Sequence, residues 1–106
     1  MAKFLVKASY TAEGAKGVQA AGGTSRRDAV AKMAEGLGGS LESFYFAFGG
    51  EDAYVICDLP DNAAAAALAM TASSSGLVGV RTVVLMAPGE IDEAAKRQVS
   101  YRAPGK

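Results

Sequence analysis

Apolar and polar residues alternate along four stretches of the chain, and this alternation predicts four β-strands. In the first stretch Phe4 and Val6 fall on one side, while Lys3 and Lys7 fall on the other. Each stretch is bounded by glycine, proline or small polar residues, which are typical of turns. The four predicted strands are residues 3–10, 40–48, 53–59 and 76–88.

Four other segments carry helical signals between and after these strands. Thr11 is placed to cap a glycine-broken, weak helix over residues 11–23. Ser25 and Asp28 have capping-box spacing at the start of a stronger helix that ends at "GLGG". A third helix is built largely of alanine, begins at Asp61 or Asn62 and runs to about residue 71. A short helix over residues 89–98 precedes an extended tail. The apolar stripe of the second helix is Val30, Met33, Ala34 and Leu37.

The order of these elements predicts an α+β fold of the ferredoxin-like type. Strands and helices follow as βαββαβ, with an extra C-terminal helix and a tail, and residues 1–106 form a single domain. A parallel sheet is the alternative for alternating strands and helices. The tight turn at Gly49–Gly50 favours an antiparallel four-stranded sheet, because it joins two consecutive strands directly.

Two helices can cover only one face of such a sheet, and the other face is not polar enough to meet water alone. Leu5, Ile56, Val83 and Leu85 interrupt its polar rows. We therefore expect a homodimer or higher homo-oligomer in which two sheets enclose a cleft. A slip of one residue in strand phase would exchange the rows, and simple interface packing is the alternative to a ligand site. The candidate ligand-binding residues in this cleft are Lys7, Ser9, Tyr45, Tyr54, Asp58 and Arg81, with Ser43 beside them.

Composition excludes several kinds of chemistry. The chain has no histidine, and its one cysteine is Cys57. Imidazole-based catalysis is therefore excluded within the chain, and neither a disulfide nor a thiolate metal cluster can form in it. We expect neither a metal nor a cofactor. The 11 basic residues balance the 11 acidic residues, which argues against nucleic-acid binding. Without a signal-like N-terminus or a long apolar run, we expect no membrane association and a cytoplasmic protein.

Several strings across the chain are together similar to the GYD-domain family. They include "GGTSRRDAV", "LGGSLESFYFAFGGEDAYVICDLPDNAAAAALA" and "VRTVVLMAPGEIDEAAK". The family signature is a Gly-x-Tyr-Asp turn, whose outer positions are matched by Gly49 and Asp52, while Glu51 replaces the tyrosine. The resemblance implies a small bacterial protein of the dimeric α+β barrel type. It supplies no catalytic residue.

The charged and reactive residues near this turn have structural explanations. Gly49 and Asp52 are expected to shape the turn, and Asp52 either fixes the hairpin or pairs with an arginine such as Arg26 or Arg81. Arg26 and Arg27 lie in the first turn of a helix, where cations oppose the helix dipole. They form either a solvated face or a contact with an anion. Cys57 is expected to be a buried, inert thiol.

These observations leave three functional hypotheses. The first is a small homo-oligomer that binds a small anionic or aromatic ligand in the cleft without chemistry. The second is a cofactor-independent monooxygenase- or isomerase-like enzyme, in which Tyr45 or Tyr54 would work with Asp58, Lys7 or Arg81. This hypothesis rests on fold analogy alone. The third is a purely structural assembly protein.

Overall fold

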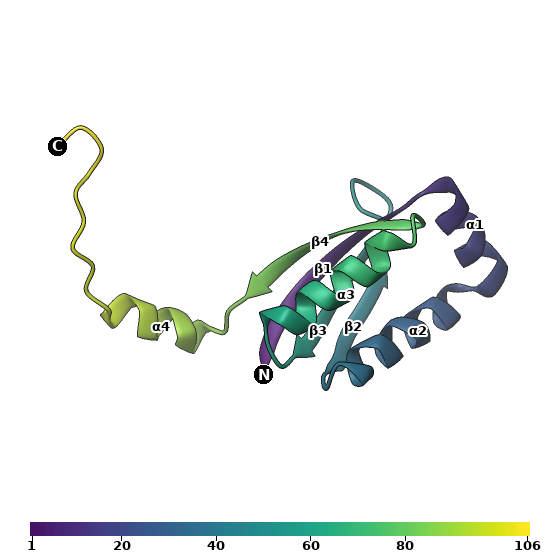
Figure 1. The fold of residues 1–106 in the computed structure, drawn as a ribbon, viewed down its shortest axis with the longest axis horizontal. Helices are drawn as coiled ribbons and strands as arrows, with labels where there is room; N and C mark the ends of the chain where they lie inside the picture. The colour runs from purple at the N-terminus through teal and green to yellow at the C-terminus, as the bar shows by residue number, and fades with distance from the viewer.

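The computed structural model describes all residues from 1 to 106 and contains four strands and four helices (Figure 1). The strands form one sheet, and three helices lie against it or beside its end. The last helix and the tail point away from the sheet. In chain order the elements are β1 (Ala2–Tyr10), α1 (Ala12–Ala21), α2 (Gly23–Gly36), β2 (Ser40–Phe46), β3 (Ala53–Leu59), α3 (Asn62–Ser74), β4 (Val78–Leu85) and α4 (Pro88–Lys96).

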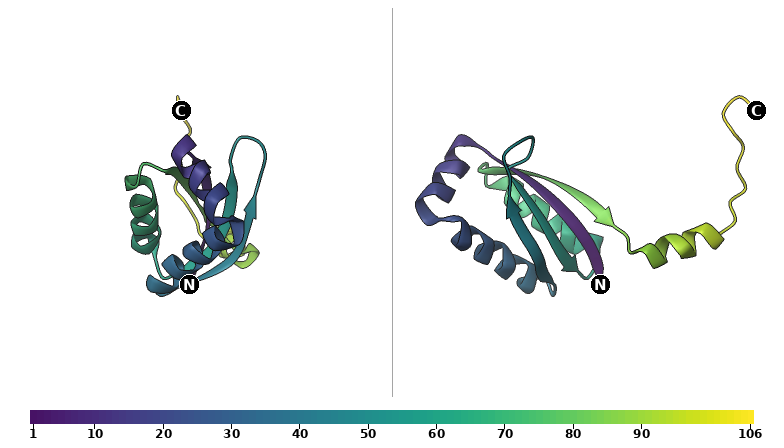
Figure 2. Two further views of the ribbon diagram at one scale, coloured as in Figure 1. Left: turned by 90° about the vertical axis from the view of Figure 1, so that its right-hand side faces the viewer. Right: turned by 180° about the vertical axis from the view of Figure 1, so that it is seen from behind.

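The sheet confirms the ferredoxin-like prediction. Its strand order is β2-β3-β1-β4, and every neighbouring pair is antiparallel. The helices cover one face only, so that in the rear view of Figure 2 the strands lie in front of α3. The glycine-broken segment after β1 forms the full helix α1, which gives the order βααββαβα.

The core lies between the helices and the face of the sheet that carries Phe4 and Val6. Their partners in β3 and β4 alternate in step, because antiparallel pairing places Phe4 opposite both Cys57 and Val84. The strand phase expected from the alternation is therefore the one that forms. The residues of the main buried cluster are Phe4, Val6, Val30, Ala34, Val55, Cys57, Leu59 and Ala65.

Two of the three helix N-caps predicted from the sequence form in the structure. The Thr11 side chain accepts a hydrogen bond from the Gly14 amide at 3.2 Å, and Asp61 accepts one from the Ala64 amide at 2.8 Å. The capping box of Ser25 and Asp28 was a wrong prediction. The second helix starts earlier, after Gly22, whose φ of 92° is open to glycine. No side chain caps α2.

The connection between β2 and β3 is longer than the predicted turn at Gly49–Gly50. β2 ends at Phe46, and residues 47–52 form a loop that is closed by a hydrogen bond from the Ala47 amide to the Asp52 carbonyl at 2.9 Å. Phe48, expected inside the strand, is fully exposed in this loop. A register shift between Leu41 and Ser43 interrupts the start of the same strand.

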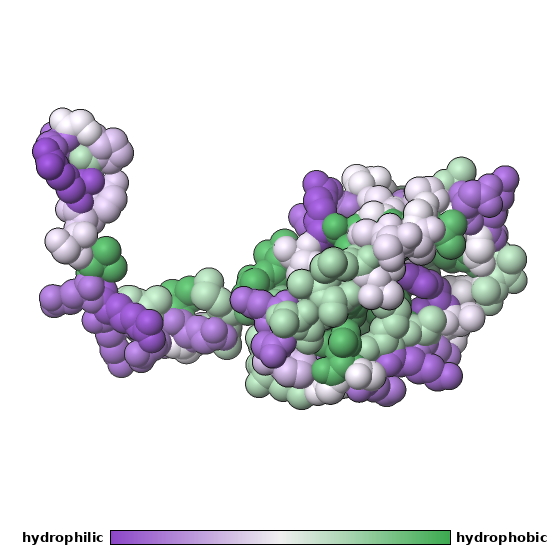
Figure 3. All heavy atoms as spheres, viewed as in Figure 1, coloured by the Kyte–Doolittle hydropathy of each residue, from purple (hydrophilic) through white to green (hydrophobic).

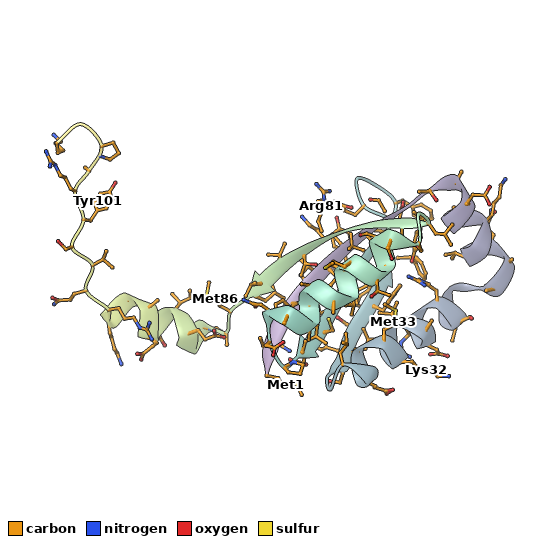
Figure 4. The ribbon with its side chains drawn as sticks, viewed as in Figure 1. Met1, Lys32, Met33, Arg81, Met86 and Tyr101 are labelled. Carbon is orange, nitrogen blue, oxygen red and sulfur yellow. The ribbon has the colours of Figure 1, made fainter.

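The two helices that cover the sheet, α2 and α3, do not pack closely on each other. The reason lies in the sequence of α3, where alanine occupies every position from 63 to 67 and only Leu68 and Met70 are long apolar side chains. Short side chains cannot reach across to α2. Met33 of α2, labelled in Figure 4, lies at the gap between the two helices. Figure 3 shows apolar and polar atoms side by side along the same region.

Residues 86–106, hereafter the C-terminal arm, extend away from the sheet and do not pack against the core. α4 has no buried residue, and the molecule extends over 56 Å in its longest dimension, with the arm at one end (Figures 1 and 2). The radius of gyration is 16.9 Å, whereas a compact chain of this length has one near about 13 Å. None of the helices has the length and hydropathy needed to cross a membrane.

Candidate functional site

Four predicted site residues form a continuous row across the uncovered face of the sheet. Tyr45 of β2 is paired with Tyr54 of β3, Tyr54 with Lys7 of β1, and Lys7 with Arg81 of β4. Directly paired residues on one face have Cβ atoms about 4.5–5.5 Å apart. The pairing therefore brings two phenols and two cations into one line that runs from one edge of the sheet to the other.

Ser9 and Arg81 meet a residue that the sequence interpretation assigned to turn chemistry. The Glu51 carboxylate accepts a hydrogen bond from Ser9 Oγ at 2.8 Å and forms an ion pair with Arg81. The Glu51 side chain is only 7% exposed, although that of Arg81 is 70% exposed. A buried carboxylate needs such partners, because desolvation disfavours its charge. Glu51 is thus a component of the site, next to Arg81, which Figure 4 labels at the β4 end of the row.

Asp52, next to Glu51, serves the hairpin. Its carboxylate accepts a hydrogen bond from the Tyr10 amide at 2.8 Å, and its own amide donates to the Ala8 carbonyl at 2.8 Å. Of the two roles considered for Asp52, the structure shows the first, and the arginine pairs with Glu51 instead. Gly49 lies in the same loop, with open space where a Cβ would be. These bonds hold the loop against the end of β1 and fix the position of Glu51.

Asp58 is the predicted site residue that the structure sets apart from the row. It pairs across the sheet with Lys3, whose ammonium donates to Asp58 at 3.0 Å and to Glu42. Asp58 lies four positions after Tyr54 along β3, a distance of about 13 Å at the rise of a strand. The hydrogen bond from Lys3 to Glu42 raises the pKa of the lysine most, and the hydrogen bond to Asp58 is the next cause. This end of the face is a self-satisfied ion cluster.

Between the row and the ion cluster lies an apolar strip. Leu5 is paired with both Ile56 and Val83, so the three side chains share the uncovered face. Val83 is 39% exposed and Tyr45 is 71% exposed. Neither of the two cavities on the helix side is lined by any residue of the polar row or of this strip. Within one chain the face is an exposed surface with apolar and charged parts.

Cys57 belongs to the opposite face and takes no part in this site. It is 1% exposed and lies in the main core cluster. Burial, followed by the charge of Asp58, raises the pKa of its thiol. A thiol that is buried and held protonated is a poor nucleophile, because the thiolate is the reactive form.

Residues 4–95 match the family model described as the GYD domain, which covers most of the chain. The chain belongs to the GYD domain family. No curated protein and no solved structure matches it. In this GYD domain, Glu51 lies in the loop between β2 and β3 and is buried against Ser9 and Arg81.

The polar groups of the sheet face differ in whether they already have partners. Its carboxylates are engaged by cations or by backbone amides, and no three acidic or thiol side chains gather into a metal-binding group. Lys7, Tyr45 and Tyr54 take part in none of the side-chain hydrogen bonds or ion pairs that engage Ser9, Arg81 and Asp58. The centre of the row therefore presents one cation and two phenols that are free to meet an added group.

Proposed function

We propose that this GYD domain acts as a homo-oligomer whose sheets face each other and hold a small anionic or aromatic ligand at the row of Lys7, Tyr45 and Tyr54. The observation that carries the proposal is the uncovered sheet face, where apolar residues and unpartnered polar groups lie side by side. Such a mixed face gains free energy when it is covered, and the polar groups then need partners.

A second copy of the chain is the occupant that suits this face. A two-fold contact brings the same patch onto itself, so the patch must be complementary to itself. The strip of Leu5, Ile56 and Val83 lies between the Lys3–Asp58 pair and the Arg81–Glu51 pair. The Arg81–Glu51 pair is neutral, whereas Lys3 with Asp58 and Glu42 carries one net negative charge. The apolar strips of two copies can pack together if the contact keeps the two negative ends apart, as an antiparallel two-fold arrangement does.

The C-terminal arm supports the same proposal. A nine-residue helix is marginal in water by itself, and α4 has no packing partner in its own chain. Apolar side chains nevertheless recur along the arm, where Ile91, Val99 and Tyr101 are all exposed. A neighbouring copy would supply the surface on which these residues pack.

The ligand class follows from the centre of the row. In the cleft between two sheets the Lys7 ammonium would be shielded from water, and a buried cation requires an anionic or hydrogen-bonding partner. Tyr45 and Tyr54 offer aromatic faces and hydroxyl groups beside it. A small carboxylate or phenolate with a flat body would satisfy both features.

Native mass spectrometry of the protein purified from its own host tests the assembly and the ligand together. We expect a dimer or a higher multiple, with a retained small molecule. Ile56→Glu places a charge on the apolar strip and should give folded monomers, whereas Ala66→Glu on the exposed side of α3 should leave the assembly unchanged. A monomeric wild-type protein at micromolar concentration would contradict the assembly.

The ligand is tested separately with Lys7→Met. This variant keeps the length and apolar stem of the side chain but removes the cation. We expect the assembly to persist and the retained molecule to be lost. A dimer that carries no ligand in either the wild type or the variant would favour a structural role instead.

A further inference from the structure

A cavity lies on the helix side of the sheet, opposite the polar row, and has a volume of about 400 Å³. Small-molecule sites typically have volumes of about 300–1,000 Å³. Its walls come from α1, α2 and α3 and from the adjoining ends of β1 and β4. Small side chains line much of it, among them Gly14 and Gly17 of α1, Ala29 of α2 and Ala72 of α3, and they leave this space unfilled.

The walls are largely apolar and carry a single charge. Val18, Met33, Leu77 and Val78 are among the lining residues, and Arg26 is the only ionisable group there besides the Tyr10 phenol. No acidic side chain lines the cavity. The cavity therefore carries the positive charge of Arg26, and no acidic side chain pairs with it.

Arg26 is unsatisfied in a specific way. Its Nε is buried from solvent and has no hydrogen-bond partner, although buried donors are nearly always paired. The guanidinium lies over the Tyr10 ring, with Cζ 5.9 Å from the ring centroid. The neighbouring Arg27, in contrast, pairs with Asp28 at 3.2 Å. The two adjacent arginines are thus in different states, and only Arg26 lacks an anion.

The surroundings of Arg26 also favour an anion. It lies in the first turns of α2, where backbone amides point toward the helix start and the helix dipole favours negative charge. That turn contains no acidic residue, and no side chain caps it. Ser25, from the same turn, lines the cavity and offers a hydroxyl group. Two independent sources of positive potential therefore meet at one wall.

A narrow extension continues from this cavity toward the sheet. It has a volume of about 30 Å³ and is lined by core residues such as Val55, Cys57 and Leu68. It shares Arg26, Met33 and Tyr10 with the larger cavity, so the two spaces are adjacent. About 30 Å³ is the volume of one water molecule, but almost all of its walls are apolar and would not hold a water well. The end of an aliphatic chain suits it better.

From these features we infer that the cavity between α2 and α3 binds a monocarboxylate with an aliphatic body. The carboxylate is held by Arg26 and Ser25, and the aliphatic body lies along Met33 of α2 and Ala72 of α3. This site is separate from the proposed ligand site of the sheet, which lies on the other face, so each can fail without the other.

The test is a titration of the full-length protein with octanoate, 1-octanol and acetate, followed by NMR of the backbone amides and of the Arg26 Nε–H. Octanoate carries both the charge and the aliphatic body, while each of the other probes carries one. We expect octanoate to bind at least about tenfold more tightly than either, with shifts confined to the elements that line the cavity, which are α1, α2, α3 and the adjoining ends of β1 and β4, and to the Arg26 Nε–H. Equal binding of octanol and octanoate, or no binding of octanoate at millimolar concentration, would overturn the inference.

Three variants identify the residues responsible. Arg26→Met should weaken octanoate binding about tenfold or more, whereas the matched Arg27→Met should leave it unchanged. Ala72→Leu fills the cavity from α3 and should abolish binding, while Ala66→Leu, on the same helix but outside the cavity, should not. The Ala72→Leu result remains informative even if Arg26→Met fails to fold. Unchanged binding in folded Arg26→Met or Ala72→Leu would refute the site.

The rival occupant is the arm of a neighbouring copy. Isotope-filtered NMR on a mixture of labelled and unlabelled chains would detect it as contacts between residues 97–103 of one copy and Met33 of another. Such contacts, together with an absence of octanoate binding, would assign the cavity to assembly and overturn the inference.

Discussion

Arg81 of β4 forms an ion pair with Glu51, which lies in the loop between β2 and β3, and this pair joins the β4 end of the polar row to the hairpin loop. The partners differ in exposure, because the carboxylate is buried while most of the guanidinium reaches solvent. The cost of breaking the pair should therefore depend on which partner is removed.

Arg81→Met should lower the free energy of unfolding by about 1–3 kcal/mol, because it leaves the Glu51 carboxylate buried with only Ser9 as partner. The double variant Arg81→Met/Glu51→Gln should recover part of this loss. Urea unfolding of the two single variants and the double variant measures the coupling. Arg97→Met is the control, since its pair with Glu93 is exposed on both sides and should contribute less than about 1 kcal/mol. Additive effects at Arg81 and Glu51 would contradict the pairing.

Asp52→Ala should destabilise the hairpin by about 1–2 kcal/mol, since the Tyr10 amide loses its acceptor. Asp52→Asn keeps an acceptor oxygen and should cost less. Amide hydrogen exchange at Tyr10 provides the local readout, and it should accelerate in the alanine variant more than in the asparagine variant. Equal exchange rates in all three proteins would show that the bond does not form.

Gly14 and Gly17, both in α1, should respond oppositely to alanine. A Cβ at Gly14 would collide with the backbone carbonyl of Leu77, so Gly14→Ala should force the start of α1 away from the loop before β4 and destabilise the fold. A Cβ at Gly17 meets nothing within 4 Å, and Gly17→Ala should stabilise the helix by about 0.5–1 kcal/mol. Thermal unfolding of the two variants checks this. Similar melting temperatures would contradict the close approach at Gly14.

The Lys3 cluster predicts a dependence of stability on alkaline pH. Hydrogen bonds to Glu42 and Asp58 raise the pKa of Lys3 in the folded state above its ordinary value of 10.5. Its contribution is therefore fully present below that value and is lost as the pH rises through the higher folded-state pKa. Comparing urea unfolding of the wild type and Lys3→Met from pH 8 to pH 11.5 isolates this contribution. The difference between the two proteins should shrink at the alkaline end, and a constant difference would contradict the cluster.

Cys57 should resist alkylation in the folded protein. Burial raises the pKa of its thiol, and its side chain is out of contact with solvent. Labelling by iodoacetamide should therefore follow the population of opened molecules and rise steeply with urea. Rapid labelling in native buffer, at the rate of a free thiol, would place Cys57 outside the core.

The sequence was sufficient to predict the four strands and the fold type, because period-two alternation is typical of strands with one buried face. It left the phase open to a slip of one residue, and the structure gives the phase that puts Phe4 and Val6 in the core. The role of Glu51 could not be predicted, since an acidic residue in a glycine-rich turn is typically exposed, and its burial depends on where β4 lies. No local signal in the sequence marks that contact.

The start of α2 and the cavity beside it depend equally on tertiary structure. Ser25 and Asp28 have the spacing of a capping box, but Gly22 can adopt a positive φ and so lets the helix begin earlier. An alanine run predicts a helix without indicating which neighbour it fails to reach. The state of Arg26 depends on how α1, α2 and the end of β1 come together, which the sequence around it does not indicate.

The C-terminal arm gives the molecule two kinds of order. The core forms all its buried contacts within one chain, so it can stay folded when the copies separate. α4 has no buried residue, so under the proposed assembly the fraction of molecules in which α4 is helical should rise with protein concentration. Dilution should then expose the arm to proteases while the sheet and its core stay folded. The protein concentration at which cleavage of the arm begins would measure the affinity of one copy for another.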